Sequence, residues 1–300
     1  MRPLVSVVVP CYNHALYIQE CIQSVINQDY HEIELIIIDD GSSDDSVAKI
    51  EELTELCEKR FLRFEFRSRP NKGLCNTLNE AMEWCSGEFY SAIASDDVLI
   101  SDKTTRQVSY LTEKPDCIAV FGSVQVVGAD GRNRRKVMSK PMSFSFEDIF
   151  LSKSFLPAPT QMIRMDKLRN SGGYRPDLYI EDWYMWLKLT ESGGSVDNIG
   201  VVLACYRRHD SNISSQLNKM ESARIQIVNL FSTNNMYSLA MANALIQSAI
   251  DSQLVSKAHS WALFFSALKI NYKALFQVRC LKYAIKSIIP KKSLARYFAG

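Results

Sequence analysis

The chain has 300 residues, of which 47% are hydrophobic and 23% are charged, and its formal net charge is +2. This composition is typical of a globular protein with one large α/β domain and an appendage, or with two smaller domains. The small net charge excludes binding to nucleic acid through bulk electrostatics, so we expect no nucleic acid among the partners.

Eight cysteines are scattered along the chain without Cys-x-x-Cys pairs or zinc-ligand spacing. In a chain of this length, such cysteines are typical of small buried residues in a reducing compartment. The first residues already resemble a strand and lack the charged and apolar regions of a signal peptide, and no apolar run is long enough to span a bilayer. We therefore expect a cytoplasmic protein.

Residues 4–85 alternate between two kinds of segment. Short apolar or β-branched runs, typical of buried strands, are followed by segments with helical spacing of apolar residues. We expect strands at residues 4–9, 33–38 and 61–66, and helices at residues 15–28, 45–58 and 74–85. This alternation predicts βαβ units, and hence a parallel sheet with right-handed crossovers.

Acidic residues follow two of the predicted strands. The apolar run at residues 88–93 leads into Asp96 and Asp97, and the strand at residues 33–38 leads into Asp39 and Asp40. Ligands in open α/β sheets bind at the carboxyl ends of strands, and Mg²⁺ and Mn²⁺ prefer carboxylate and phosphate oxygens. Acids before a turn are equally typical of a helix cap or a solvated loop. Because neighbouring strand residues face opposite ways, we assign Asp39 to the turn.

Beyond Asp97 the regular alternation ends. We expect strands at residues 117–127, 160–164 and 201–206, with a hairpin turn at residues 128–131. Further helices are expected at residues 102–113, 144–151, 166–170 and 180–189. From residue 216 onward the pattern is helical and lacks acid clusters.

Six short motifs follow one another between residues 4 and 215. They are Val7 to Asn13, Ile38 to Asp44, Asn71 to Gly73, Ser95 to Asp97, Glu181 to Trp183, and Tyr206 to His209. Together they resemble the glycosyltransferases of family 2, which have the GT-A fold. The resemblance implies a Rossmann-like α/β domain with a mixed sheet flanked by helices. It further implies a nucleotide-sugar half at residues 1–125, an acceptor-binding and catalytic half at residues 126–215, and a C-terminal helical extension at residues 216–300.

The family makes glycosidic bonds from nucleotide-sugar donors, generally with a divalent metal ion and with inversion at the anomeric carbon. The resemblance therefore implies an inverting enzyme of surface polysaccharide, lipopolysaccharide (O-antigen) or glycolipid synthesis. Its cofactor would be Mn²⁺ or Mg²⁺, and its acceptor a glycan or a lipid-linked oligosaccharide. We expect UDP as the nucleotide because it is the most frequent in the family.

The resemblance also assigns roles to single residues. The nucleotide would contact Pro10, Tyr12, Asn13, Asp40 at the base, Asn71, Gly73, and Asp96 at the ribose. Asp97 would ligate the metal ion. Arg207 and His209 would lie near the diphosphate, with a metal contact and an ordinary loop role both open for His209. Many members carry a further Asp where this chain has Ala94, so His209 or water would complete the metal site.

Glu181 and Asp182 match the Glu-Asp pair of the family, in which the second acid is the general base. A departing diphosphate gains negative charge that a metal ion neutralises, and a carboxylate that takes the proton of the acceptor hydroxyl contributes ~10²–10⁴-fold. One base opposite the leaving group suffices for inversion. Alternatively, the two acids only complement the dipole of a helix that begins there. We expect Trp186 in the core, whereas Trp183 is a candidate for stacking on a sugar ring.

Two other functions stay open. A sugar-phosphate nucleotidyltransferase would share the fold class, but it needs a Gly-rich loop after the first strand, where this chain has Pro10 to Asn13. A non-catalytic glycan-binding or scaffold protein would lose the acids that this chain keeps.

The last part of the chain interleaves basic with apolar and aromatic residues between residues 269 and 296. This mixture is typical of a solvated helix face or of a helix that lies on anionic lipid. We favour the second interpretation, in which the enzyme is peripheral on the inner face of the cytoplasmic membrane.

Overall fold

A computed structural model describes residues 2–132, 134–209, 212, 215–276, 280, 283 and 287. The chain divides into two compact units. The first comprises Met1–Phe146, Ser154–Asp177 and Glu181–Asp210, and the second comprises Glu147–Lys153, Leu178–Ile180 and Ser211–Gly300. The boundary expected between residues 125 and 126 falls inside a strand of the first unit.

In the described part of the first unit, ten strands form one sheet. They are β1 (Val5–Cys11), β2 (Ile33–Asp39), β3 (Arg63–Ser68), β4 (Phe89–Ala92), β5 (Val98–Leu99), β6 (Cys117–Gly128), β7 (Arg135–Val137), β8 (Met142–Phe144), β9 (Met162–Arg164) and β10 (Ser195–Arg208). Their order is β3-β2-β1-β4-β9-β6-β10-β5, with β7 paired to β6 and β8 paired to β10.

The sheet is mixed, as the resemblance implied. Strands β3, β2, β1 and β4 are parallel, which confirms the βαβ units expected from the first part of the chain. Strand β9 runs antiparallel to both β4 and β6, and β10 runs parallel to β6 but antiparallel to β5. The carboxyl ends of β1, β2 and β4 therefore lie along one edge of the sheet.

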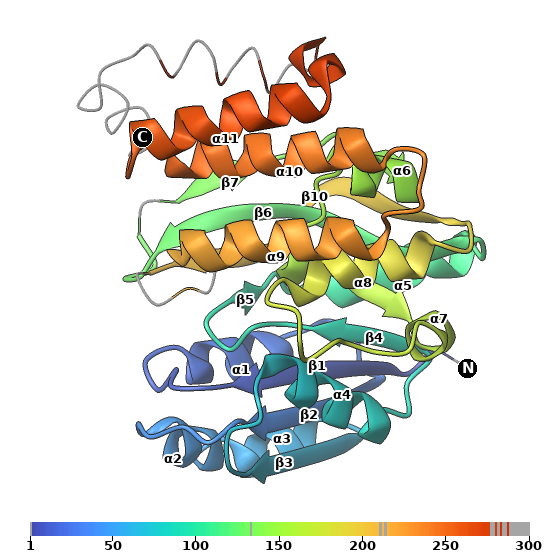
Figure 1. The fold of residues 1–300 in the computed structure, drawn as a ribbon. Helices are drawn as coiled ribbons and strands as arrows, with labels where there is room; N and C mark the ends of the chain where they lie inside the picture. The colour runs from blue at the N-terminus through green and yellow to red at the C-terminus, as the bar shows by residue number, and fades with distance from the viewer. Residues whose placement is uncertain are drawn as a thin grey trace. The chain divides into compact units, whose positions relative to one another are not determined.

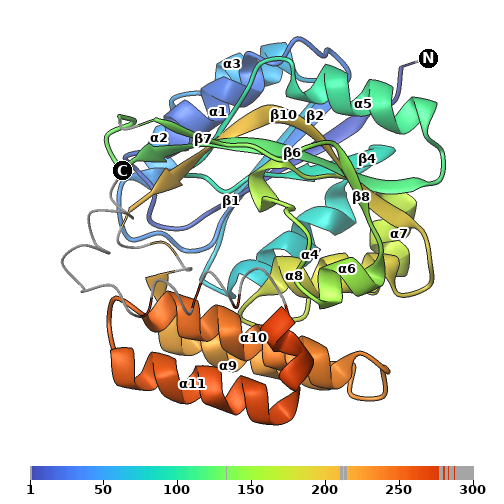
Figure 2. The same ribbon diagram turned by 90° about the horizontal axis from the view of Figure 1, so that it is seen from above.

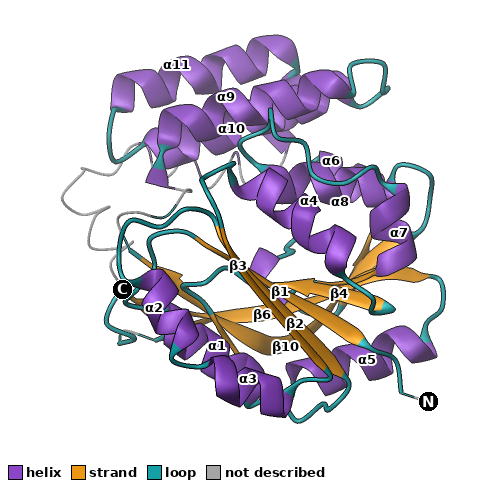
Figure 3. Ribbon diagram, turned by 90° about the horizontal axis from the view of Figure 1, so that it is seen from below, coloured by secondary structure: helices purple, strands orange, loops and turns teal. Residues whose placement is uncertain are grey.

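Helices cover both faces of this sheet (Figures 2 and 3). One face carries α1 (Ile18–Ile26), α2 (Ser46–Glu51), α3 (Thr54–Arg60) and α5 (Lys103–Glu113), and the other carries α4 (Leu74–Trp84), α7 (Met165–Asn170) and α8 (Glu181–Thr190). On the first face, Val7 and Val9 of β1 share a fully buried cluster with Ile18 and Ile22 of α1. Residues two apart in a strand, and residues four apart in a helix, lie on the same face, so these pairs meet.

Three expectations from the sequence were wrong in detail. The helix expected at residues 45–58 is divided into α2 and α3, with a break at residues 52–53. Strands β5 and β8 were missed, because two and three residues are too few to show a hydrophobic period. Strand β10 is longer than expected, since its register shifts between Asn198 and Val202, around Gly200 with φ of 76°, and this interrupts the alternation.

The described part of the second unit is helical, as expected. It contains α9 (Leu217–Leu230), α10 (Tyr237–Ser252), α11 (Lys257–Ile270) and the 3₁₀ helix η3 (Tyr272–Phe276), and α10 packs against both α9 and α11 (Figure 1). The helix α6 (Phe146–Phe150) and the 3₁₀ helix η1 (Ala158–Thr160) complete the elements. Among the described residues, no helix combines the length and the apolar character needed to cross a bilayer.

Candidate active site

The loops that follow β1 and β2 are tied to each other. The main-chain N–H of Asn13 donates to Oγ of Ser42 at 2.8 Å, and that of His14 donates to Oγ of Ser46 at 2.9 Å. In return, Oδ1 of Asn13 accepts from the N–H of Ser43 at 2.8 Å. Asn13 has a φ of 53°, a left-handed conformation that Asn tolerates better than most residues. These bonds fix the backbone that carries His14.

Asp40 holds the loop at residues 69–73. Its buried carboxylate accepts from the guanidinium of Arg69 and from the main-chain N–H groups of Lys72 at 2.8 Å and Gly73 at 2.9 Å. Its main-chain oxygen accepts from Nδ2 of Asn71 at 2.8 Å. A carboxylate has about four acceptor positions, so Asp40 retains capacity for one further donor. The contact with the base that the resemblance assigned to Asp40 stays a prediction.

Asp39 has the turn role that we expected. Its carboxylate accepts from the N–H groups of Gly41 at 3.2 Å and Ser42 at 3.0 Å. On the neighbouring loop, the ring of Tyr12 is 50% exposed and is therefore accessible to a ligand. Pro10, at the end of β1, pairs with Ile38 of β2.

Asp96 lies in the turn between β4 and β5, and His209 directly follows β10. Nε2 of His209 lies 2.8 Å from Oδ2 of Asp96. Nδ1 of His14 lies 4.0 Å from Oδ1 of Asp96 and 2.7 Å from Oγ of Ser95. One ligand atom from each of His14, Asp96 and His209 lies within 4.8 Å of the others. These donors fit a divalent metal ion, since imidazole and carboxylate are ordinary metal ligands.

Asp97 has a different environment from Asp96. Its Oδ1 accepts from the main-chain N–H of Arg207 at 2.8 Å, and Nε of Arg207 donates to the main-chain oxygen of Asp96 at 2.9 Å. Burial, together with the neighbouring charge of Asp96, raises the pKa of Asp97. The sequence predicted Asp97 as a metal ligand, but the cluster of donors contains Asp96 and not Asp97.

Aromatic rings surround the two histidines. Tyr17 stacks on His209 with ring centroids 5.1 Å apart, and the guanidinium of Arg207 lies over Tyr17 at 5.0 Å. The rings of His14 and His209 meet edge to face at 5.6 Å. Burial lowers the pKa of His14 despite the charge of Asp96, which favours the neutral form that binds metals. Neither His14 nor Tyr17 was among the expected site residues, because neither has a local sequence pattern that predicts these contacts.

Glu181 and Asp182 begin α8, and both are half-buried. Burial, and then the charge of Asp182, raises the pKa of Glu181 to about 8, and burial raises that of Asp182. Near neutral pH, Glu181 is therefore mostly protonated. Glu181 also raises the pKa of the Cys75 thiol, after burial. Glu181 is thus close enough to Cys75, in the first turn of α4, to act on it electrostatically.

Other expectations concern the core. Trp186 is buried and meets Phe121 edge to face at 4.8 Å, which confirms its assignment to the core. All eight cysteines are unpaired, and all except the half-buried Cys205 are buried, as their scattered positions predicted.

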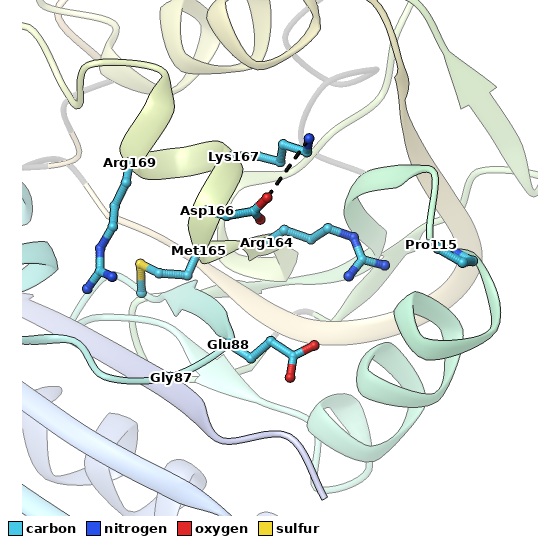
Figure 4. Close-up of a pocket in the computed structure, with 8 residues that line it drawn as sticks. All are labelled: Gly87, Glu88, Pro115, Arg164, Met165, Asp166, Lys167 and Arg169. Carbon is cyan, nitrogen blue, oxygen red and sulfur yellow. Dashed lines mark ion pairs between the residues drawn. The ribbon is translucent and has the colours of Figure 1, made fainter.

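A hollow of about 530 Å³ lies at the opposite edge of the sheet, before β4 begins (Figure 4). It is lined by Gly87, Glu88, Pro115, Arg164, Met165, Asp166, Lys167 and Arg169. Arg164 donates to the main-chain oxygen of Cys117 at 2.8 Å, and Arg169 donates to that of Cys85 at 2.7 Å. Both arginines therefore stabilise main-chain segments beside the hollow by hydrogen bonds.

The mixed sheet, with acids and histidines at the carboxyl edge of its parallel strands, defines a glycosyltransferase of the GT-A class. The chain belongs to glycosyltransferase family 2, since the profile described as "Glycosyl transferase family 2" matches residues 6–172. The protein is thus a glycosyltransferase, and the family excludes the nucleotidyltransferase and the non-catalytic scaffold that the sequence alone left open.

Known proteins resemble this chain in sequence and in structure. The UDP-Glc:alpha-D-GlcNAc-diphosphoundecaprenol beta-1,3-glucosyltransferase WfgD of Escherichia coli is 28% identical over 227 residues, which cover 74% of this chain and 83% of the relative. TarS 1–349 of S. aureus in complex with UDP-GlcNAc has a TM-score of 0.69 and 18% identity, covering 95% of this chain and 88% of TarS. The mannosyltransferase PcManGT of Pyrobaculum calidifontis, in complex with GDP-Man and Mn²⁺, has a TM-score of 0.60 and 16% identity, covering 96% and 88%. The two structures share the fold of this chain.

Proposed function

We propose that this protein transfers a sugar, with inversion, from a UDP-sugar to a lipid-linked saccharide during the synthesis of a bacterial surface glycan. The contact between His209 and Asp96 carries this proposal, because it sets metal-binding donors at the carboxyl edge of the sheet. The names of the E. coli relative and of the TarS complex support UDP, and the relative's name also supports a diphosphoundecaprenol-linked acceptor.

The nucleotide would bind over the loops that follow β1 and β2. The exposed ring of Tyr12 is suited to stacking on a base, and the remaining acceptor position of Asp40 is suited to an N–H of uracil. Asn13, Asn71 and Gly73 would shape this site through the hydrogen bonds that already hold their loops.

Mn²⁺ or Mg²⁺ would be held by Asp96 and His209. A bound ion would neutralise the charge that develops on the departing diphosphate. In this proposal Asp97 has a positioning role: it fixes the main chain of Arg207, whose side chain holds the turn that carries Asp96. The ribose contact predicted for Asp96 and the metal contact predicted for Asp97 are replaced by this assignment.

Asp182 would take the proton of the acceptor hydroxyl. Its pKa is raised by burial, which makes its carboxylate a stronger base than an exposed one. Glu181, protonated at neutral pH, would leave the negative charge of the pair on Asp182. One such base, opposite the leaving group, leads to inversion.

A peripheral position on the membrane would bring the enzyme to a lipid-linked acceptor. Part of the basic stretch that favoured this interpretation lies outside the described residues. In the described part of the second unit, exposed aromatic side chains at Phe265, Tyr272 and Phe276 accompany the exposed Lys269 and Lys273. Aromatic and basic side chains together are typical of a surface that binds anionic lipid.

The test is a thermal-shift screen of the purified protein against UDP, GDP, dTDP and CMP, each with and without Mn²⁺. A ligand that binds only the native state raises the melting temperature, so we expect a rise with UDP that depends on Mn²⁺. Transfer from UDP-sugars to a diphosphoundecaprenol-linked saccharide is then measured, with Asp182→Asn as the inactive control. A metal-dependent rise with GDP in place of UDP would refute the donor class.

A further inference from the structure

We infer that His14 is a third protein ligand of the metal ion, so that two imidazoles and one carboxylate hold it and select Mn²⁺ or Co²⁺ over Mg²⁺. This inference rests on the proposed function, in which the carboxyl edge of the sheet binds a metal ion together with a nucleotide diphosphate. It adds a ligand that the sequence motifs do not indicate and a preference among ions.

Two of the three pairs of side chains have separations that suit one ion, and one ligand atom from each of the three lies within 4.8 Å of the others. Metal bonds to imidazole nitrogen and carboxylate oxygen are each roughly 2.1 Å long, so two ligand atoms on one ion lie at most ~4.2 Å apart, and ~3 Å apart at a right angle. Nδ1 of His14 and Oδ1 of Asp96 are 4.0 Å apart, within that limit. Nε2 of His209 and Oδ2 of Asp96, at 2.8 Å, are close to the right-angle separation.

Both imidazoles are held in position before any ion binds. The main chain of His14 is fixed by Ser46, and its ring meets Tyr17 edge to face at 5.9 Å. The ring of His209 stacks on the same Tyr17. A ligand set that is already in place loses little conformational entropy on binding.

A metal ion bound to His14 would replace the hydrogen bond between this residue and Ser95. Its hydroxyl lies 2.7 Å from Nδ1 of His14, on the side of the ring that faces Asp96. A metal ion would take over this nitrogen, and the hydroxyl would rotate to another partner, so Ser95→Ala should not weaken metal binding. If His14 had only a structural role through this hydrogen bond, Ser95→Ala would act like a His14 variant.

The donor set determines the choice of ion. Mg²⁺ is bound mostly through oxygen ligands and keeps several waters, whereas imidazole suits transition-metal ions. The affinity of a mixed nitrogen and oxygen site rises from Mn²⁺ to Co²⁺. Removal of His14 would leave one imidazole and one carboxylate, and the preference for transition-metal ions would fall.

The experiment measures the affinity of the full chain for Co²⁺ and for Mg²⁺ by calorimetry, with and without UDP, and records the visible absorption of bound Co²⁺. We expect His14→Ala and His14→Asn to lower the affinity for Co²⁺ about tenfold or more, to change that for Mg²⁺ little, and to alter the Co²⁺ spectrum. The exposed His31 gives the matched control, His31→Ala, which should behave as the unmodified chain. Melting temperatures of all variants establish that they fold.

The outcomes separate this inference from the proposed function. An unchanged ratio of Co²⁺ to Mg²⁺ affinity and an unchanged spectrum in both His14 variants would overturn the inference, even where UDP binds with metal. Loss of Co²⁺ affinity in Ser95→Ala equal to that in His14→Ala would overturn it as well. If Co²⁺ binds through His14 and UDP binds with no ion, the inference holds and the proposed function fails.

Discussion

The main-chain N–H of Arg207 donates to Oδ1 of Asp97 at 2.8 Å, across 110 residues of sequence. This bond joins the turn after β4 to the end of β10, and two residues further on His209 reaches Asp96. The two adjacent acids therefore differ in what they contact: Asp97 binds the main chain, and Asp96 faces the histidines.

Because the two adjacent acids have different contacts, we expect Asp96→Asn and Asp97→Asn to affect the binding of UDP differently. Asp96→Asn should abolish binding of UDP that depends on Mn²⁺, because it removes the charged ligand. Asp97→Asn should retain most of it, because the amide oxygen can still accept from the N–H of Arg207. Calorimetry of UDP with Mn²⁺ measures both. The reverse result, loss with Asp97→Asn alone, would restore the assignment of Asp97 as the ligand.

The acid pair of α8 predicts a contrast between two isosteric variants. Asp182→Asn should lower kcat by ~10²–10⁴-fold without weakening the binding of UDP, because it removes the base. Glu181→Gln should reduce kcat far less at pH 7, where Glu181 is already protonated, given its pKa of about 8. Single-turnover transfer assays provide the rates. Equal losses in the two variants would show that Glu181 has a direct part in proton transfer.

The burial of Lys103 predicts how the free energy of unfolding depends on pH. Its ammonium is fully buried, and burial lowers its pKa to about 7, while Nζ donates to Oγ of Ser91 at 2.7 Å. Between pH 7 and the ordinary pKa of 10.5, the unfolded chain binds more protons at this residue than the folded chain does, so its contribution to stability rises with pH. Below pH 7 Lys103 is charged in both states, and its burial destabilises the folded chain by the full amount.

Lys103→Met keeps the length of the side chain and removes this titration. We expect the variant to be more stable than the unmodified protein at pH 7, with a difference that shrinks as the pH approaches 10. Urea unfolding at several pH values measures it. A difference that does not change between pH 7 and pH 10 would mean that Lys103 stays charged in the folded chain throughout this range.

The exposed basic and aromatic side chains of α11 and η3 predict binding to anionic lipid. Reversal of charge in Lys269→Glu with Lys273→Glu should weaken sedimentation with vesicles that contain anionic lipid, since each lysine near such a surface contributes about 1 kcal/mol. Lys59→Glu, at an exposed helix position of the first unit, is the control and should have no effect. If the unmodified chain fails to sediment with these vesicles, the peripheral position is wrong.

The sequence by itself determined the strands β1, β2 and β4 and the acids that follow them. Runs such as residues 33–38 are buried on both faces, so their composition alone indicates a central parallel strand. The motifs indicated the family, because each lies where a strand ends or a helix begins. These features depend on residues close together in the chain, which local patterns describe.

Only the tertiary structure decided which side chains meet. Asp96 and Asp97 are neighbours in sequence, and their different contacts depend on the direction of the turn after β4 and on the pairing of β10 with β5 and β6. His14 joins His209 because the loops after β1 and β2 are tied together and because β10 returns to the same edge of the sheet. Such contacts between distant segments have no local pattern in the sequence, since they arise only when the sheet is assembled.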